Sequence, residues 1–433
     1  MSFLKVLGFD PAKHNVKTEI VAGITTFLTM AYILAVNPDI FSALEEMGMP
    51  KGAVFTATAL AAIVGTLVMS LYAKKPYALA PGLGLNAFFV YTVCLTMGYS
   101  WQFALTAVLI EGIIFIILTA TNVREAIINA IPKSMKSAVS AGIGLFIAFI
   151  GLVNAGIIVD DGGTIISLGT ITSGPALLAI VGLVITSVMM ILKVPGAMLI
   201  GIIVTAIIGI PFGITKFDGV VSAVPSVAPI FCKFEFHNIL TWDMIIVVFT
   251  FLFIDMFDTI GTVIGVSKKA NAMNPDGTIP GVKKVLMADA VATVWGAICG
   301  TSTTTTYVES ASGVAEGGRT GLTSFTVAIC FAIALFFAPV FLAIPSAATA
   351  PALILVGVMM MSSILDVDFN DFSECIPAYI CMIVMPLAYS ISDGIMLGMI
   401  SFVVLNALTG KFKKISVMMW ILAILFILRY ILL

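Results

Sequence analysis

Long apolar runs recur along the whole chain, and they constrain its fold more than any other sequence feature. Fourteen such runs, each bounded by glycine, proline or charged residues, lie between residues 18 and 410. Only 10% of the residues are charged, against roughly 25% in a soluble domain that must cover its surface. Lipid is therefore the expected solvent, and in lipid the backbone must satisfy its own hydrogen bonds, as helices do. We predict an all-α polytopic protein of the cell membrane.

The predicted spans divide into seven before and seven after a polar loop at 215–241. The first seven are 18–40, 53–73, 84–98, 102–121, 134–155, 174–192 and 196–214. The second seven are 242–267, 284–299, 305–317, 321–343, 347–363, 374–391 and 393–410. Two of them, 84–98 and 305–317, are short and interrupted by small polar residues, so hydropathy alone supports them weakly.

The basic residues support fourteen crossings with the N-terminus in the cytoplasm. This topology places 17 of the 21 lysines and arginines on the cytoplasmic side: Lys5, Lys13, Lys17, Lys74, Lys75, Arg124, Lys133, Lys136, Lys193, Lys268, Lys269, Lys283, Lys284, Arg319, Lys411, Lys413 and Lys414. The other side receives only Lys51, Lys216 and Lys233, and Arg429 lies in the final apolar stretch. Cytoplasmic loops are enriched in basic residues, and removing either weak span would destroy this asymmetry.

Seven spans per half place the two halves upside down relative to each other, which is the inverted-repeat plan of secondary transporters. The expected organisation is a first repeat at 1–214, an extracellular connecting loop at 215–241, a second repeat at 242–414 and a C-terminal apolar helix at 415–433. That last stretch could form a fifteenth span. We favour instead a helix that lies along the membrane or packs on a partner.

The two weak spans occupy the third position of each repeat, and both contain sequence that disfavours helix. Residues 81–86 read Pro-Gly-Leu-Gly-Leu-Asn, and residues 300–307 read Gly-Thr-Ser-Thr-Thr-Thr-Thr-Tyr. Glycine, proline and runs of β-branched residues favour extended or irregular backbone. Interrupted segments at matching positions of two repeats are the sequence feature that best indicates a substrate site at the midplane.

Ionisable side chains within spans are costly and mark functional sites. All five candidates are acidic: Glu111, Asp255, Asp258, Asp289 and Glu309. No lysine or arginine lies in the middle of the fourteen spans to pair with them. A buried carboxylate without a basic partner takes up a proton more readily than one in water, so these acids suit proton coupling.

Asp258 and Glu309 are the leading candidates for a substrate site. Glu309 follows the threonine run, where extended chain is expected to turn into helix, and a helix N-terminus favours the charged carboxylate. We expect Glu309 to accept hydrogen bonds from ligand N–H groups and Asp258 to carry the coupling proton, with Glu309 and Asp255 as further coupling candidates. Asp255 lies three residues before Asp258 on one helical face. Asp255 and Glu111 could equally serve helix packing, and Asp289 is expected to cap a helix or reach the cytoplasmic surface.

Neutral residues near these acids could complete the site. Asn86 offers a donor and an acceptor, and Gly84 permits close approach of the backbone. Phe88, Phe257 and Tyr307 could stack on a planar ring. Each of these aromatic residues could alternatively pack in the core, and the glycine could serve tight helix packing.

Other chemistries lack the residues that they need. The six cysteines are scattered without a CxxC pair, and the acidic cluster at 366–374 lacks the spacing of a calcium loop, so we expect no metal site. The chain has no GxxxxGK[ST] phosphate loop and no basic stripe for nucleic acid. We therefore expect no cofactor and no enzymatic activity, but a transporter driven by a proton gradient.

Four stretches of the chain closely resemble the nucleobase:cation symporter-2 family, in its AzgA-like purine permease branch. They are residues 23–33, 81–89, 255–262 and 309–322, and the last reads ESASGVAEGGRTGL. The resemblance extends from about residue 8 to 410 and implies fourteen spans in core and gate domains, with short antiparallel strands in the third and tenth spans. It also implies homodimers, and import of a purine nucleobase by proton symport with elevator-like alternating access.

Carried over to matching positions, the resemblance implies that Asp258 and Glu309 contact the base. Gly84 and Asn86 would support it from the third span, and the backbone around Tyr307 and Val308 would line the pocket.

The chain departs from the uracil and ascorbate branches of that family. Those branches show Glu-x-x-x-His where this chain has Asp258 and Thr262, and the chain lacks their Asn-x-Gly-x-x-x-x-Thr signature after Glu309. The departure argues against uracil as the substrate. A coupling step that uses this histidine is not available to the chain, because Thr262 stands in its place.

Three rival functions remain open at this point. An anion permease on the same plan would need a cationic or neutral site. An intramembrane aspartyl protease would need an acid after the glycines at 82 and 84, where Leu85 and Asn86 stand. A passive channel would need rings of charged residues, which are absent from the sequence.

Overall fold

The computed structural model describes residues 2–121, 131–172, 174–217, 219–237, 239–274 and 279–432. Within these residues, nine helical stretches are long and apolar enough to cross a membrane, and four shorter apolar helices accompany them. The prediction of a helical polytopic membrane protein is therefore confirmed, whereas the exact number of crossings stays a prediction. Arg124, one of the basic residues assigned to the cytoplasm, lies outside the described residues, as do the side chains of Lys268 and Phe257.

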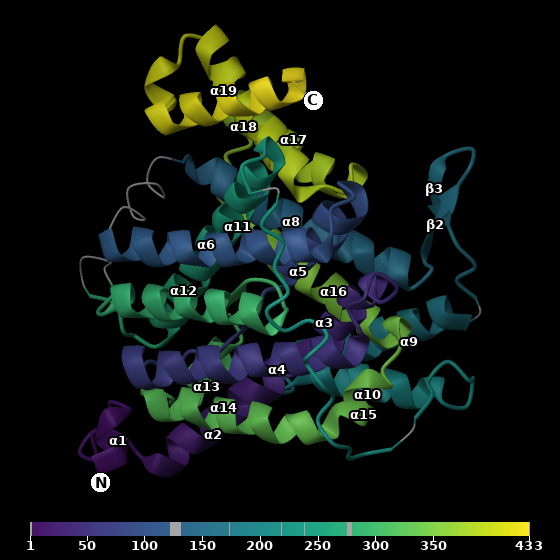
Figure 1. Ribbon diagram of the computed structural model, residues 1–433, viewed down its shortest axis with the longest axis vertical. Coiled ribbons are helices and arrows are strands. Elements are labelled where there is room, and N and C mark those ends of the chain that lie inside the picture. The colour runs from purple at the N-terminus through teal and green to yellow at the C-terminus, as the bar shows by residue number, and fades with distance from the viewer. Residues whose placement is uncertain are drawn as a thin grey trace.

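Each predicted span contains helical chain, although the one at 305–317 begins in a strand and is helical only over Ser310–Ala315. Figure 1 labels most of the elements. Those of the first half are α1 (Ser2–Val6), α2 (Val16–Met30), α3 (Ile33–Phe41), η1 (Ser42–Leu44), α4 (Lys51–Val68), η2 (Met69–Ala73), β1 (Leu79–Pro81), α5 (Leu83–Ala87), η3 (Phe88–Thr96), α6 (Trp101–Thr121), α8 (Lys133–Asn154), β2 (Ile158–Asp161), β3 (Ile165–Leu168), α9 (Gly174–Ile191) and α10 (Ala197–Gly209). Those of the second half are α11 (Trp242–Lys269), α12 (Val282–Cys299), β4 (Thr304–Thr306), α13 (Ser310–Ala315), α14 (Gly321–Ala334), η4 (Leu335–Phe337), α15 (Ala338–Leu342), α16 (Ser346–Met361), η5 (Ser362–Asp366), α17 (Phe372–Leu387), α18 (Ile391–Leu408), η6 (Phe412–Lys414) and α19 (Val417–Leu432).

Short polar residues set several helix starts. The Asn15 side chain accepts hydrogen bonds from the first backbone N–H groups of α2, and Asp371 does the same for α17. Thr320 caps α14, and Ser390 caps α18 after the tight turn that follows α17. These caps satisfy N–H groups that have no partner within the helix, so they define where each helix begins.

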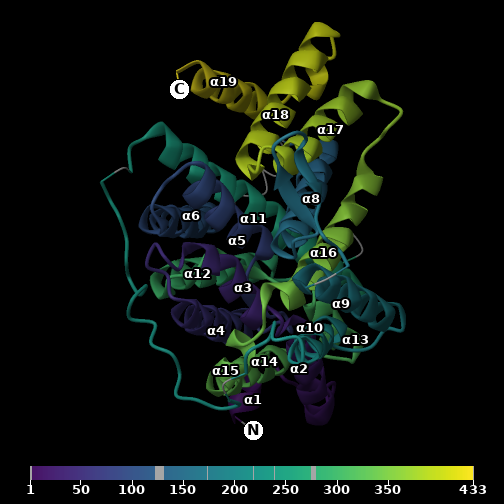
Figure 2. The ribbon, with the colours of Figure 1, turned by 90° about the vertical axis from the view of Figure 1, so that its right-hand side faces the viewer.

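The helices pack into two groups. In the first helix group, α4 and α6 pack on α12, α2 packs on α14 and α13, and α11 packs on α6. In the second helix group, α8 packs on α16 and α17, α9 packs on α10 and α16, and α17 packs on α18. Figure 2 shows α6, α12 and α4 on one side of the molecule and α8, α16 and α9 on the other.

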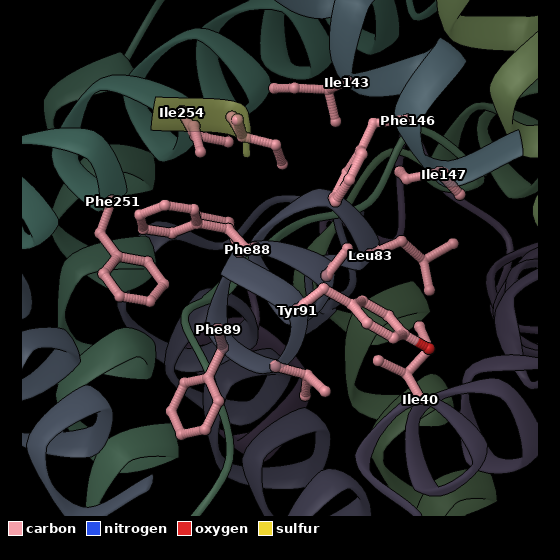
Figure 3. Packing of buried hydrophobic residues seen from close by; sticks show 14 of the residues in the cluster. Ile40, Leu83, Phe88, Phe89, Tyr91, Ile143, Phe146, Ile147, Phe251 and Ile254 are labelled. Carbon is pink, nitrogen blue, oxygen red and sulfur yellow. The ribbon is translucent and has the colours of Figure 1, made fainter. Parts of the chain in front are cut away.

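Aromatic and aliphatic side chains fill the space where the two helix groups meet. Phe88 packs edge-on against Phe251 with ring centroids 4.8 Å apart, and both are fully buried. Figure 3 shows them beside Ile254 of α11, with Ile143 of α8 nearby. The core therefore includes residues of α11, which carries Asp258, and of α8, which belongs to the second helix group.

Two short strands meet inside the helical body, one from each half of the chain. β1 and β4 are antiparallel, and their register pairs Leu79 with Thr306 and Pro81 with Thr304. β4 lies within the broken segment predicted at 300–307, whereas β1 overlaps the one predicted at 81–86 only at Pro81, and Leu83–Ala87 form the short helix α5. Gly300 ends α12 in a left-handed conformation, and a Cβ atom there would lie 2.6 Å from the Ile230 carbonyl oxygen, so this turn requires glycine.

Candidate functional site

The paired strands position the start of two short helices at one place. Gly82 N donates to the Thr303 carbonyl at 3.0 Å, and Tyr307 N donates to the Ala78 carbonyl at 2.9 Å, so the pairing extends beyond both strand ends. The chain then turns into α5 after β1 and into α13 after β4, with Glu309 directly before α13. Extended backbone is tolerated within a membrane only when it is buried in protein or lines a cavity.

A cavity of about 410 Å³ opens beside these strand ends and lies between the two helix groups. The first helix group and the strands contribute Tyr32, Gly82, Leu83, Gly84, Ile254, Asp258, Gly261, Thr262, Thr306, Tyr307, Val308 and Glu309. The second helix group contributes Val139, Ser140, Ile143, Val356, Met359, Met360, Ser362 and Ser363. Asp258 and Glu309 are the charged side chains among these lining residues, and none of the described residues that line the cavity is basic.

Glu309 is held by a tyrosine from the first span. The Tyr32 hydroxyl donates to Glu309 Oε1 at 2.6 Å, and Tyr32 itself is 2% exposed. The Tyr307 hydroxyl donates to the Pro81 carbonyl at 2.6 Å, which ties the turn after β4 to the end of β1. These bonds fix the orientation of the carboxylate and of one aromatic wall of the cavity.

Asp258 lies on α11 and lines the same cavity. It makes no hydrogen bond to a described residue, in contrast to Glu309. Thr262, one turn further along α11, also lines the cavity, and Gly261 has open space around its Cβ position. The cavity can therefore hold a ligand that donates to one held carboxylate and interacts with a second, less restrained one.

The remaining candidate residues divide between the cavity wall and the layer behind it. Gly84 and Val308 line the cavity. Asn86 is fully buried behind β1, where its Oδ1 accepts from the Ser302 hydroxyl, so it lies outside the cavity lining. Phe88 lies one turn beyond Gly84 and packs against Phe251, a position that does not fit the predicted stacking on a ligand.

Three further acids form a hydrogen-bonded layer behind β4. Asp289 Oδ1 accepts from both the backbone N–H and the hydroxyl of Thr306 at 2.9 Å, and its Oδ2 accepts from Thr259. Asp255 also accepts from Thr259 at 3.1 Å, and Glu111 accepts from the Thr303 hydroxyl at 2.6 Å.

The expectation that Asp289 caps a helix or reaches the cytoplasmic surface is therefore wrong. Asp289 is fully buried and braces the strand, because β4 directs the polar groups of Thr306 toward α12. Asp255 is likewise absent from the cavity lining, so its predicted coupling role stays a prediction.

Sequence reasoning did not single out Tyr32, nor the second wall formed by α8 and α16. A hydroxyl in the middle of the first apolar span was the available signal for Tyr32. Ser140 and Ser363 lie on the second wall with their hydroxyl oxygens 3.1 Å apart. Both belong to predicted spans that hydropathy does not show as broken, so the sequence did not indicate them as site residues. Among the described residues, no group of three or more His, Cys, Asp or Glu side chains could hold a metal ion.

Two permeases from other organisms are similar to this protein over nearly its whole length. The guanine/hypoxanthine permease PbuG of Bacillus subtilis is 45% identical over 433 residues, which cover 98% of this chain and 98% of that protein. The adenine permease AdeQ of Escherichia coli is 41% identical over 418 residues, which cover 96% of this chain and 94% of that protein.

Solved structures share the fold at low sequence identity. The transmembrane domain of the cyanobacterial bicarbonate transporter BicA matches with a TM-score of 0.65 and 16% identity, covering 89% of this chain and 97% of that chain. The murine anion transporter Slc26a9 matches with a TM-score of 0.67 and 13% identity, covering 95% of this chain and 70% of that chain.

The sequence match to a known family spans most of the chain. Residues 17–397 match the Permease family Xan_ur_permease. This match and the relatives above agree with the motifs at 23–33, 81–89, 255–262 and 309–322. The chain therefore belongs to the Xan_ur_permease family, the nucleobase:cation symporter-2 family that those motifs indicated.

Proposed function

We propose that the protein imports purine nucleobases by proton symport. One observation carries this proposal: two carboxyl side chains, Asp258 and Glu309, line a single cavity together with tyrosine and aliphatic side chains. A neutral purine presents N–H donors and ring acceptors along its edge and an apolar face on each side. Carboxylates accept from the edge, and the ring of Tyr307 covers a face.

The size and chemistry of the cavity support a small heterocyclic substrate. Its volume of about 410 Å³ lies within the range of roughly 300–1,000 Å³ that small-molecule sites occupy. Hydrogen bonds left unmade in such a site penalise ligands that lack the matching groups. The relatives named for guanine, hypoxanthine and adenine support the purine class.

The proposed mechanism uses the two acids differently. Glu309, held by Tyr32, accepts hydrogen bonds from the base, and Asp258 carries the proton that enters with it. Protonation makes Asp258 neutral, and a neutral side chain moves through a low-dielectric environment more easily than a charged one. The reason is that desolvating a charged carboxylate costs more free energy. Binding of both the proton and the purine shifts the protein toward the state that releases them in the cytoplasm.

The two helix groups correspond in this proposal to a core and a gate domain that move relative to each other. The first helix group holds the strands and both acids, and the second provides the opposite wall. The proposal includes fourteen crossings in two inverted repeats, a cytoplasmic N-terminus, residence in the cell membrane, contact with lipid and a homodimer, with no cofactor beyond the proton gradient.

The contacts at each end of the cavity support an inward-facing arrangement. The lining includes Ser362 and Ser363, which follow α16 at its proposed cytoplasmic end. At the other end of α16, the hydroxyls of Ser346 and Thr349 donate to the buried Asp39 carboxylate of α3 at 2.7 and 2.6 Å. α3 packs on α4 of the first helix group, so Asp39 ties the two helix groups together on the proposed outer side.

The main rival is an anion permease on the same fold, since BicA and Slc26a9 bear the names of anion transporters. The cavity argues against it, because two carboxylates and no basic side chain among the lining residues would repel an anion.

An uptake assay separates these functions. The chain is expressed in a host without purine transport, and uptake of radiolabelled guanine, hypoxanthine, adenine, uracil and bicarbonate is compared. We expect uptake of at least one purine that excess unlabelled purine suppresses and a protonophore abolishes. Uptake of bicarbonate without purine uptake would favour the rival, and purine uptake insensitive to the protonophore would refute proton coupling.

A further inference from the structure

The C-terminal helix α19 packs along the helical body with one face. Its buried residues Met419, Leu422, Ala423 and Phe426 recur at helical spacing. The helix contacts α18, and the Phe426 ring packs edge-on against Phe249 of α11 with centroids 5.6 Å apart. Figure 1 shows α19 beside α18.

Ion pairs hold the chain just before α19 near the beginning of α17. Lys414 Nζ lies 2.7 Å from Asp371 Oδ2 and 2.8 Å from Glu374 Oε1, and Lys411 Nζ lies 3.0 Å from Asp371 Oδ1. Because α17 and α18 form a helical hairpin, the beginning of α17 and the end of α18 lie at the same end of that hairpin.

A second group of contacts holds the last turn of α19 at the opposite end of α18. Arg429 lies between two acids, with Nη1 3.5 Å from Asp393 Oδ1 and Nη2 3.7 Å from Asp243 Oδ1. The Tyr430 hydroxyl donates to Asp393 at 2.6 Å. Asp393 belongs to the first turn of α18, and Asp243 belongs to the first turn of α11.

These two sets of contacts place α19 antiparallel to α18 along the full length of that helix. α18 has 18 residues and is long and apolar enough to cross a membrane. A helix that accompanies a membrane-crossing helix from end to end crosses the same layer. We propose that α19 crosses the bilayer as a further span whose outer face contacts the acyl chains of lipid.

The exposed face of α19 fits acyl chains and does not fit a membrane surface. Val417, Ile424 and Ile431 are 77%, 53% and 71% exposed, and they lie at the beginning, middle and end of the helix. A helix that lies in the interface needs a charged or strongly polar face toward water. In α19 the only charged residue is Arg429, and it is paired with acids at one end.

The length and the ends of α19 agree with a short crossing. Its 16 residues span about 24 Å at 1.5 Å per residue, somewhat less than the hydrocarbon core of about 30 Å. Lys413 and Lys414 precede the helix, and near its other end Arg429 is paired with acids in the first turns of α11 and α18, so basic side chains flank both ends as they do in membrane spans. This inference replaces the sequence-based preference for a helix along the membrane or on a partner.

Labelling of single cysteines tests the crossing. Cys232 and Cys330, the cysteines that are not buried, are replaced by alanine. Lys413→Cys and Ile431→Cys are then introduced separately, both at exposed positions. A membrane-impermeant maleimide is added to intact cells and, in parallel, to permeabilised cells. Lys13→Cys and Thr164→Cys, in exposed segments at the N-terminus and in the turn between β2 and β3, serve as references for the two sides.

We expect one of the two test cysteines to react in intact cells and the other only after permeabilisation. Reaction of both in intact cells, or of neither, would place both ends on one side and overturn the proposal. A nitroxide attached at position 424, compared with positions 417 and 431, measures depth independently. We expect the strongest relaxation by oxygen and the weakest by a water-soluble nickel complex at position 424, and equal values at all three positions would contradict the crossing.

Discussion

Replacing Glu309 by glutamine tests whether this carboxylate provides the acceptor that a ligand N–H group needs. One carboxylate oxygen of Glu309 accepts from the Tyr32 hydroxyl at 2.6 Å, and the side chain lines the cavity. Glutamine keeps the shape but replaces one acceptor oxygen by an NH2 donor. If the amide oxygen keeps the bond to Tyr32, the NH2 group faces the cavity and meets the ligand N–H as a second donor. If the amide turns over, Tyr32 must rotate to accept.

The expected magnitude follows from one hydrogen bond to a charged group. Such a bond contributes about 1.5–3 kcal/mol, and 1.4 kcal/mol corresponds to a tenfold change in Kd. We therefore expect Glu309→Gln to weaken purine binding about 10- to 150-fold. Equilibrium binding of radiolabelled guanine to the purified protein measures this change directly, without the transport cycle.

Glu316→Gln provides the matched control. Glu316 lies at the end of α13, is exposed and is absent from the cavity lining, so its substitution should leave guanine binding unchanged. A thermal melt of each variant shows whether it is folded. Guanine affinity within twofold of the parent protein in a folded Glu309→Gln variant would refute the assigned role of Glu309.

Three further predictions concern stability and its pH dependence. Gly313→Ala should lower the melting temperature, because the new Cβ atom would lie 2.3 Å from a carbonyl oxygen of α2. This overpacking should lower the free energy of unfolding by about 1–3 kcal/mol. Gly265→Ala should leave the melting temperature unchanged, because no neighbouring atom of the described residues lies within 4 Å of the new Cβ position. Equal melting temperatures of the two variants would show that α13 can shift away from α2. Asp39→Ala should cost about 1.5–3 kcal/mol in a denaturation assay, because two hydroxyls of α16 lose their acceptor, and an unchanged midpoint would refute the tie between the helix groups. Hydrogen bonds from lysine and serine partners lower the pKa of Asp371, so its stabilising contribution is present above the ordinary aspartate range and is lost as the pH falls toward the lowered value. The melting temperatures of Asp371→Asn and the parent protein should therefore differ at pH 7 and begin to converge below about pH 4, and a constant difference at all lower pH values would contradict this linkage.

The sequence indicated the helical segments and the two interruptions because both depend on local properties. Apolar length predicts a helix in lipid, and β4 falls within the segment 300–307, whose threonine content disfavours helix. β1 reaches the segment 81–86 only at Pro81, and Leu83–Ala87 form a short helix despite Gly84. The layer behind β4 could not be predicted in the same way. Asp289 appeared to belong near a surface, and only the pairing of distant strands brings Thr306 to it.

The site was predicted in part, because helical spacing only approximates where a side chain points. Gly84 lines the cavity, and Asn86, two residues later, lies about 200° around the helix and points behind the strand. Asp258 lines the cavity while Asp255, three residues earlier, is rotated by about 60° and bonds to Thr259. The second wall comes from α8 and α16, whose approach depends on packing between distant segments.

The proposed transport of purines depends most on Asp258 and Glu309 sharing one ligand-filled cavity. A cryo-electron microscopy map of the protein with bound guanine tests this directly. We expect the base between the two helix groups, with its polar edge toward Glu309 and Asp258 and its ring beside Tyr307. Density for the base at another place, or an empty cavity at saturating guanine, would contradict a shared purine site at Asp258 and Glu309.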